Sequence, residues 1–352
     1  MTRRGRQLDE DDVRIRPPRG KSRPRSKVRP GHDQALPGFV TAVDRGRFTV
    51  QVGAPRDGRW LPPQADAGEV FAVKARELGR KGIVVGDHVS LVGDLSGGPD
   101  ARARIVRRQA RATVLRRSAD DVDTTERVIV ANADQLAVVA ALADPTPRRR
   151  LIDRALVAAF DGGLQPLLVL TKSDLAAPDA LLENYIALDL PTFVVRAGGD
   201  HTALTEQLQG HETVLVGHSG VGKSTLVNAL IPDAARATGD VNAVTGRGRH
   251  TSTSAVALPL PCGGWIVDTP GIRSLGLAHV EVARILHAFP DLEVGAQQCP
   301  RGCTHEPAVA TGPDDDREQC ALDAFVADGH AEAARLRSLR RLLNSRAGSD
   351  ED

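Results

Sequence analysis

The stretch Gly217-His218-Ser219-Gly220-Val221-Gly222-Lys223-Ser224 decides the fold of this chain, because it has the pattern of a phosphate-binding loop. An apolar run that ends at Val216 precedes it, and a helical pattern from Thr225 to Leu230 follows it, as this motif requires. The N–H groups of the loop and of Thr225 would hold the phosphates of a nucleotide. Lys223 would bridge the β- and γ-phosphates, and the Ser224 hydroxyl would bind Mg²⁺. The alternative is a turn made by glycines for structural reasons alone.

A second stretch, Thr171-Lys172-Ser173-Asp174, follows an apolar strand and lies upstream of the loop. The Asp174 carboxylate can accept two hydrogen bonds from N1 and N2 of guanine, a donor pair that adenine does not offer. The stem of Lys172 can lie over the purine ring. In ordinary GTPases this motif comes after the phosphate loop, so the order predicts a circularly permuted GTPase. A plain turn at the end of a strand is the alternative.

The stretch Asp268-Thr269-Pro270-Gly271 comes about 40 residues after the loop and is a candidate for switch II. Asp268 is expected to hold Mg²⁺ through a water molecule, and the Gly271 N–H to sense the γ-phosphate. The next residue is Ile272, where many GTPases carry a glutamine that positions the attacking water. Because an apolar side chain cannot orient a water molecule, we expect slow intrinsic hydrolysis.

The candidate for switch I is Gly246-Arg247-Gly248-Arg249-His250-Thr251-Ser252-Thr253, between the loop and switch II. Thr251 would supply a second hydroxyl to Mg²⁺, and His250 would position or activate the attacking water. His250, Thr251 and Lys223 are therefore the expected catalytic residues. In isolation, such a segment is more often a surface loop.

Cys299, Cys303, His305 and Cys320 form the pattern C-x3-C-x-H-x14-C. Thiolate and imidazole ligands indicate a structural Zn²⁺ with all four tetrahedral positions filled by protein. Scattered buried cysteines are the alternative. The remaining cysteine, Cys262, is expected to be structural.

The basic charge is concentrated at the N-terminus, where residues 1–35 hold eleven Arg or Lys although the chain has a net charge of only +1. Such a segment buries too little apolar surface to fold, and it is either a nucleic-acid contact or a solvated tail. No apolar run approaches the ~20 residues that a membrane helix needs, and no secretory signal is present. We therefore expect a cytoplasmic protein that does not bind a membrane, and a monomer.

Short β-rich runs between residues 37 and 110 predict a small barrel, with the OB fold as the leading candidate. From about residue 128, apolar strands alternate with helices, which indicates a parallel sheet covered on both faces. The fold class is α/β, and the expected parts are a disordered basic arm (1–36), an OB-type barrel (37–110), the permuted P-loop GTPase domain (111–278), a helical zinc-binding domain (279–346) and a disordered tail (347–352).

The last helical segment has two faces. Its leucines have helical spacing and should pack on the body of the protein, whereas the interleaved arginines form a basic face. The leucines are Leu336, Leu339, Leu342 and Leu343, and the arginines are Arg335, Arg337, Arg340 and Arg341. The basic face is either simply solvated or a contact for RNA.

Together these motifs resemble the ribosome small-subunit-dependent GTPase A (RsgA) family over roughly residues 37–345. Arg249-His250-Thr251 is similar to the switch I signature of that family, and the four Cys and His residues are similar to its zinc ligands. The resemblance implies GTP hydrolysis during late maturation of the small ribosomal subunit, stimulated by the subunit and its rRNA. It also implies one structural Zn²⁺, and Mg²⁺ bound with GTP or GDP.

The chain departs from the family at two places. The first two cysteines are separated by three residues, where the family often has four, and the gap between His305 and Cys320 is longer than usual. The Ser-Ala pair that contacts guanine in the family would fall near Arg196-Ala197, where the serine is absent. Three alternatives stay open: a permuted GTPase of the large ribosomal subunit, a P-loop ATPase or kinase, and an RNA-binding scaffold with a vestigial pocket.

Overall fold

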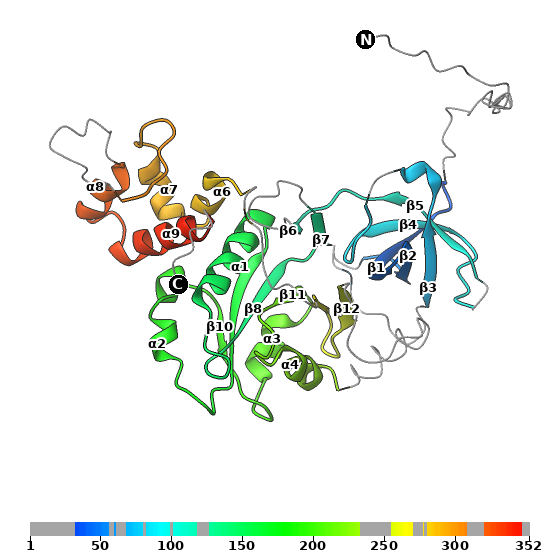
Figure 1. The fold of residues 1–352 in the computed structure, drawn as a ribbon. Coiled ribbons are helices and arrows are strands. Elements are labelled where there is room, and N and C mark those ends of the chain that lie inside the picture. The colour runs from blue at the N-terminus through cyan, green and yellow to red at the C-terminus, as the bar shows by residue number, and fades with distance from the viewer. Residues whose placement is uncertain are drawn as a thin grey trace, which may run out of the picture. The chain divides into compact units, whose positions relative to one another are not determined.

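The computed structural model describes residues 32–55, 60, 68–79, 82–98, 101–117, 127–232, 255–269, 277, 280–307 and 320–346. Residues 34–352 form one compact unit, which contains every element labelled in Figure 1. The expected switch I segment with His250 and Thr251, together with Gly271 and Ile272, lies outside the described residues. Most of the expected N-terminal arm and the whole C-terminal tail also lie outside them.

The first five strands close into a barrel (Figure 1). They are β1 (Leu36–Asp44), β2 (Arg47–Val52), β3 (Glu69–Lys74), β4 (His88–Gly93) and β5 (Ala103–Arg108), and a short 3-10 helix, η2 (Arg76–Leu78), follows β3. β1 pairs with both β2 and β4, and β3 pairs in parallel with β5, which completes the ring through β4. The side chains of Val40, Val50 and Ile105 inside it are fully buried. The barrel predicted from the spacing of short apolar runs is therefore confirmed.

A two-stranded antiparallel ribbon, β6 (Val114–Arg117) and β7 (Arg127–Ala131), follows the barrel. The chain then enters a sheet with the order β10-β9-β8-β11-β13, in which all neighbours are parallel. These strands are β8 (Gln135–Ala141), β9 (Gln165–Thr171), β10 (Thr192–Val194), β11 (Glu212–Val216) and β13 (Trp265–Asp268). The parallel sheet read from the alternation of strands and helices is thus present.

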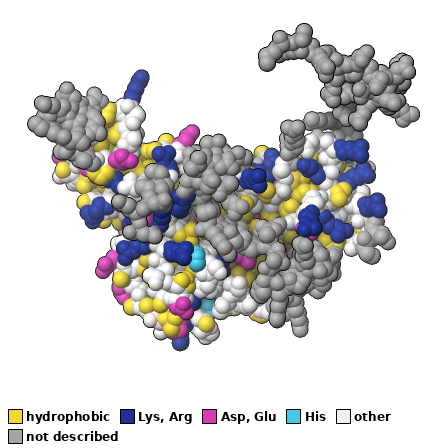
Figure 2. Space-filling view, viewed as in Figure 1, with side chains coloured by type: hydrophobic (Ala, Val, Ile, Leu, Met, Phe, Trp, Pro, Cys, Tyr) yellow, Lys and Arg dark blue, Asp and Glu magenta, His cyan; other side chains and the backbone are white. Residues whose placement is uncertain are grey.

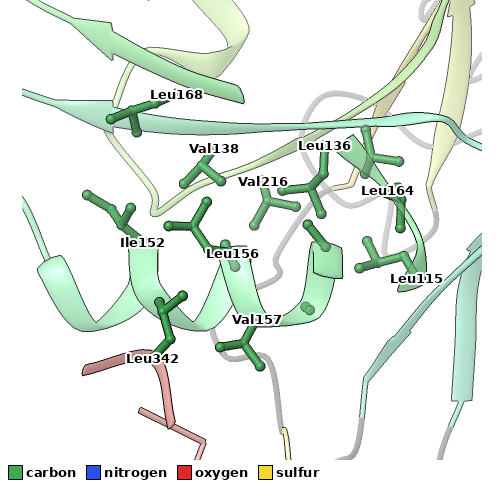
Figure 3. Close-up of a cluster of buried hydrophobic side chains, with 14 of the residues drawn as sticks. Leu115, Leu136, Val138, Ile152, Leu156, Val157, Leu164, Leu168, Val216 and Leu342 are labelled. Atoms are coloured by element: carbon green, nitrogen blue, oxygen red, sulfur yellow. The ribbon is translucent and has the colours of Figure 1, made fainter. Parts of the chain in front are cut away.

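Helices cover both faces of this sheet, which explains why its strands are apolar throughout. Along β8, Leu136 and Val138 face the core beneath α1 (Arg149–Gly162), whereas Ala137 and Val139 face the opposite core. The second core contains α3 (Thr202–Leu208) and α4 (Lys223–Leu230). Figure 3 shows that α1 lies between the sheet and a residue of the last helix, Leu342. The short helices α2 (Asp179–Leu182) and η3 (Ile186–Leu188) pack in the same core as α1.

The barrel and the parallel sheet are continuous, which the sequence did not predict. An additional strand, β12 (Val256–Pro259), pairs antiparallel with β13, and its Val256 lies opposite Ala42 of β1. Beside this junction, Trp265 Nε1 donates a hydrogen bond to the Trp60 carbonyl at 2.6 Å, and both rings are close to Phe39. The strand β13 carries Asp268 at its C-terminal end, and Trp265 at its N-terminal end is therefore fixed to the barrel.

A buried carboxyl lies at the same junction. Glu212 at the start of β11 is buried, and its Oε2 has no hydrogen-bond partner among the described residues. Burial, reinforced by the nearby Asp134 carboxylate, raises the pKa of Glu212 well above its ordinary value. The folded protein therefore holds this proton up to a higher pH than the unfolded chain does.

We predict that Glu212→Gln stabilises the protein at alkaline pH. A carboxyl whose pKa is raised on folding contributes stability that is complete below its unfolded pKa and is lost as pH rises through the folded value. The amide avoids that loss, so the gain at pH 8 should be about 1–3 kcal/mol, the usual cost of an unsatisfied buried group, and should vanish near pH 4. Urea unfolding across this pH range measures it, with Glu206→Gln on an exposed face as the control. A gain that did not depend on pH would contradict the explanation.

The described residues of the C-terminal region contain the helices α6 (Val282–Leu286), α7 (Pro290–Ala296), α8 (Ala321–Ala327) and α9 (Ala333–Arg346). The four leucines of α9 are buried, as the spacing predicted. The arginines expected to form a basic face are mostly paired with carboxylates, however. Arg335 pairs with Asp291, Arg340 with Asp323 and Arg341 with Asp153, and of the four only Arg337 is exposed. These ion pairs fasten α9 to its neighbours, including α1.

Within the described ranges, every helix is too short or too polar to span a lipid bilayer.

Candidate functional site

The phosphate-loop motif forms the turn between β11 and α4, and its glycines are required by the backbone. A Cβ atom on Gly217 would lie 2.3 Å from the carbonyl oxygen of Val139, so no side chain fits there. Gly220 and Gly222 have φ values of +84° and +94°, a conformation that other residues rarely adopt. Gly222 is the N-cap of α4, so the free N–H groups of the helix begin at the end of the loop. Ser224 and Thr225 in its first turn are exposed and accessible to a ligand.

Lys223 bends back over the loop that precedes it. Its Nζ donates to the carbonyl oxygens of Gly217 at 2.5 Å and His218 at 3.0 Å. Burial lowers the pKa of Lys223, and the nearby Asp268 carboxylate opposes this shift. Burial likewise raises the pKa of Asp268, opposed by Lys223. The two side chains from β13 and α4 therefore share one partly desolvated site, which suits a cation and a phosphate chain.

The guanine motif touches the phosphate loop, although the two are far apart in sequence. Thr171 is buried at the end of β9, and its hydroxyl donates to the Val221 carbonyl at 2.5 Å. Lys172 has a φ of +57°, and its Nζ donates to the Asp144 carbonyl. Asp174 is exposed, with its carboxylate open to a ligand. The two motifs thus form one continuous edge of the sheet, where open α/β sheets bind ligands.

The start of switch II lies at the same edge. Asp268 is paired with Leu215 in the register of β13 and β11, and the Thr269 hydroxyl donates to the Leu215 carbonyl at 2.8 Å. This bond holds the first residues of switch II against the strand that leads into the phosphate loop. His250, Thr251 and Gly271 stay predictions from the sequence, because they lie outside the described residues.

Sequence reasoning missed one segment of this site, the loop after β8. It supplies the Asp144 carbonyl that accepts a hydrogen bond from Lys172. The Pro145 ring lies beside the phosphate loop, 3.7 Å from the position that a Cβ atom would take on Gly220. The available signal was the run Pro145-Thr146-Pro147 directly after a buried strand, since such loops lie at the ligand-binding edge. Arg196-Ala197, where the Ser-Ala pair of the family would fall, follows a residue that contacts the guanine motif, since Ser173 N–H donates to the Val195 carbonyl at 3.3 Å.

A second candidate site is the cluster of Cys299, Cys303, His305 and Cys320, whose ligand atoms all lie within 4.8 Å of one another. Cys299 Sγ is 3.8 Å from Cys320 Sγ and 3.6 Å from His305 Nδ1. Sulfur ligands about 2.3 Å from a tetrahedral Zn²⁺ are about 3.8 Å apart, so this geometry fits zinc. None of the cysteines forms a disulfide.

Cys320, which is separated from His305 by an unusually long gap in the sequence, is at the N-cap of α8, and its Sγ points into the cluster. Burial raises the pKa of its thiol to about 12 without a metal, so a bound cation is what would hold it as a thiolate. Arg340 of α9 donates to the His305 carbonyl at 2.9 Å and also pairs with Asp323. The cluster is thereby connected to the helix that packs on α1.

Comparisons with known proteins agree with this architecture. A sequence model of the family described as RsgA GTPase matches residues 108–278. A small ribosomal subunit biogenesis GTPase RsgA of Pseudomonas syringae pv. tomato is 37% identical over 290 residues, which cover 80% of this chain and 79% of that protein. A protein of the same name from Pseudomonas putida is 38% identical over 291 residues, covering 80% of each.

Two solved structures show the same fold. YjeQ from Thermotoga maritima matches with a TM-score of 0.58 and 24% identity over 90% of this chain and 99% of that one. YloQ, described as a circularly permuted GTPase, matches with a TM-score of 0.59 and 21% identity over 91% and 98%. Because the guanine motif precedes the phosphate loop, and because relatives 37–38% identical share most of their length with it, the chain belongs to the RsgA family of circularly permuted GTPases.

Proposed function

We propose that this protein is a GTPase that binds the small ribosomal subunit and hydrolyses GTP to GDP and phosphate during late maturation of that subunit. The observation that carries the proposal is the hydrogen bond from Thr171 to Val221, which joins the segment Thr171–Asp174 to the loop Gly217–Ser224 and so supports one site for base and phosphates. The curated relatives are named for small ribosomal subunit biogenesis, which supports the partner.

In this proposal Asp174 reads guanine, and Lys172 covers the purine. Thr171 and Ser173 hold the motif in place. The loop from Gly217 to Thr225 binds the phosphates, with Lys223 neutralising charge that develops in the transition state. Mg²⁺, which comes with the nucleotide, would be held by Ser224 and, in the GTP state, by Thr251. Asp268 would hold Mg²⁺ through a water molecule.

We propose His250 as the residue that positions or activates the attacking water, because Ile272 cannot do so. Thr251 closes over the metal, and the Gly271 N–H senses the γ-phosphate. These residues would be ordered by GTP and by the subunit, which explains why the subunit should stimulate turnover.

The other parts of the chain supply contacts to rRNA and structural support. Figure 2 shows Lys and Arg side chains gathered over the barrel, where the exposed arginines are Arg45, Arg47, Arg76, Arg102, Arg104 and Arg107. We propose that this surface meets the phosphate backbone of rRNA. One structural Zn²⁺ at the Cys/His cluster would fix the helical region. We propose that the domain boundaries follow residues 36, 110, 278 and 346, and that the protein is a cytoplasmic monomer.

We predict slow, GTP-selective turnover that small ribosomal subunits raise strongly and that His250→Ala reduces by about a hundredfold or more. The measurement is phosphate release from GTP and from ATP, with and without purified small subunits. His287→Ala, which removes a histidine 82% exposed on the C-terminal helices, is the matched control.

Each alternative has its own outcome. Stimulation by large subunits instead would identify a different ribosomal partner, and turnover unaffected by either subunit would remove the partner proposed here. Equal hydrolysis of ATP would contradict the role of Asp174 and favour a P-loop ATPase or kinase.

A further inference from the structure

A cavity of about 470 Å³ lies apart from both the nucleotide edge and the Cys/His cluster. Its walls come from the end of β5, the segment that leads to β6, the ribbon β6–β7, the C-terminal end of α1, and α6. None of the residues that line it belongs to the phosphate loop or the guanine motif. Four of them are arginines: Arg108, Arg111, Arg116 and Arg284.

Arg111 and Arg284 each contact a carboxylate of the described residues. Arg111 Nε and Nη2 each donate to an oxygen of Asp87 at 2.7 Å, so its guanidinium is fixed as part of the wall. Arg284 donates to the Asp161 carbonyl at 3.0 Å, with the Asp161 carboxylate 3.5 Å away. Asp161 is the only acidic residue among the described residues that line the cavity.

Arg108 is different. Its Nε is buried, yet it has no hydrogen-bond partner among the described residues. A buried donor without a partner is unfavourable, and groups of this kind are usually satisfied by a ligand or by water. Arg116 on β6 adds another positive charge to the same wall. The cavity is therefore lined by a guanidinium, that of Arg108, which no carboxylate of the described residues holds, in a space of the size that ligand sites usually have.

We propose that this cavity binds a phosphate group, with Arg108 as its principal ligand. A guanidinium presents two parallel N–H donors that match two oxygens of a phosphate, and such charge-assisted pairs are strong and short. Arg284 and Arg111 would orient around the same anion without leaving their carboxylates. Because β5 leaves the barrel here and α6 begins the C-terminal helices, one bound phosphate would contact all three structured parts of the chain.

The phosphate group has two possible sources. One source is the phosphodiester backbone of RNA, and this version of the proposal rests on the proposed function. The other is a free phosphate anion, and that version does not depend on the proposed function. The test uses full-length protein saturated with GDP and Mg²⁺, so that the phosphate loop is occupied. Inorganic phosphate and a ten-nucleotide oligouridylate RNA are titrated separately at constant ionic strength, and binding is followed through the arginine Nε–H resonances in NMR spectra.

We expect at least one of the two probes to bind and to shift these resonances. Arg108→Gln should weaken that binding at least about tenfold, the effect of losing one charge-assisted pair. The matched control is Arg107→Gln, which removes the same charge from the next residue of β5, an exposed arginine outside the cavity. Binding of RNA alone identifies the phosphodiester source, and binding of phosphate alone identifies a free anion.

Equal effects of Arg108→Gln and Arg107→Gln, or no binding of either probe, would overturn the proposal. If Arg108→Gln does not fold, Arg284→Gln, at a half-exposed side chain, tests the same cavity. Neither residue contacts the nucleotide edge, so GTP hydrolysis without subunits should be unchanged. A failure of this proposal is therefore distinguishable from a failure of the proposed GTPase function.

Discussion

Asp174→Asn is expected to weaken GTP binding by about a hundredfold or more and to allow binding of xanthosine triphosphate. The carboxylate accepts hydrogen bonds from N1–H and N2–H₂ of guanine, and an amide offers one acceptor and one donor in the same place. The amide N–H₂ would then face the guanine amino group, with neither donor satisfied. Xanthine carries a carbonyl oxygen at position 2, which accepts from that amide. Titration of fluorescent GDP, GTP and xanthosine nucleotides measures the exchange of specificity.

The matched control for this prediction is Asp179→Asn, a nearby exposed carboxylate at the start of α2. It should leave nucleotide selectivity unchanged. Loss of both GTP and xanthosine triphosphate binding in Asp174→Asn would indicate damage to the fold rather than to base recognition. Unchanged GTP affinity would contradict the assignment of Thr171–Asp174 as the guanine motif.

Replacing a residue of the Cys/His cluster should remove one zinc ion per chain and unfold the C-terminal helices. Metal binding to a small structural zinc site is worth about 10–16 kcal/mol at pH 7, a large share of the stability of the segment that carries the ligands. In Cys320→Ser, the hydroxyl is a poor zinc ligand, and α8 loses the contact at its N-cap. Zinc content by elemental analysis and proteolysis between α7 and α9 report the two effects.

Cys262→Ser is the control, because Cys262 lies in the turn between β12 and β13, apart from the cluster. It should retain one zinc per chain and the thermal stability of the parent. Zinc retained by Cys320→Ser would show that this cysteine is not a ligand. Zinc absent from the parent protein would contradict the site altogether.

The sequence determined the order of the motifs, and with it the permuted fold. Phosphate loops and guanine motifs are local, because each needs only a strand end, a few glycines and one or two charged side chains. The strand β8 (Gln135–Ala141) was legible as a continuous apolar run, because both of its faces are buried. The leucines of α9 were legible from their spacing, because burial of one helix face imposes a helical period. For the same reason the closed barrel was predictable from its short alternating runs.

The tertiary structure decided what depends on distant partners. Pairing of β12 with β1, and the contact of Trp60 with Trp265, require two parts of the chain about two hundred residues apart, and no local pattern encodes them. The arginines of α9 had the spacing of a basic face, yet three of them are paired because Asp153, Asp291 and Asp323 happen to lie opposite in space. Cys320 likewise joined the cluster through the fold. Sequence fixes which chemistry is available, and long-range packing fixes which groups meet, because only the folded chain brings charges and ligands within bonding distance.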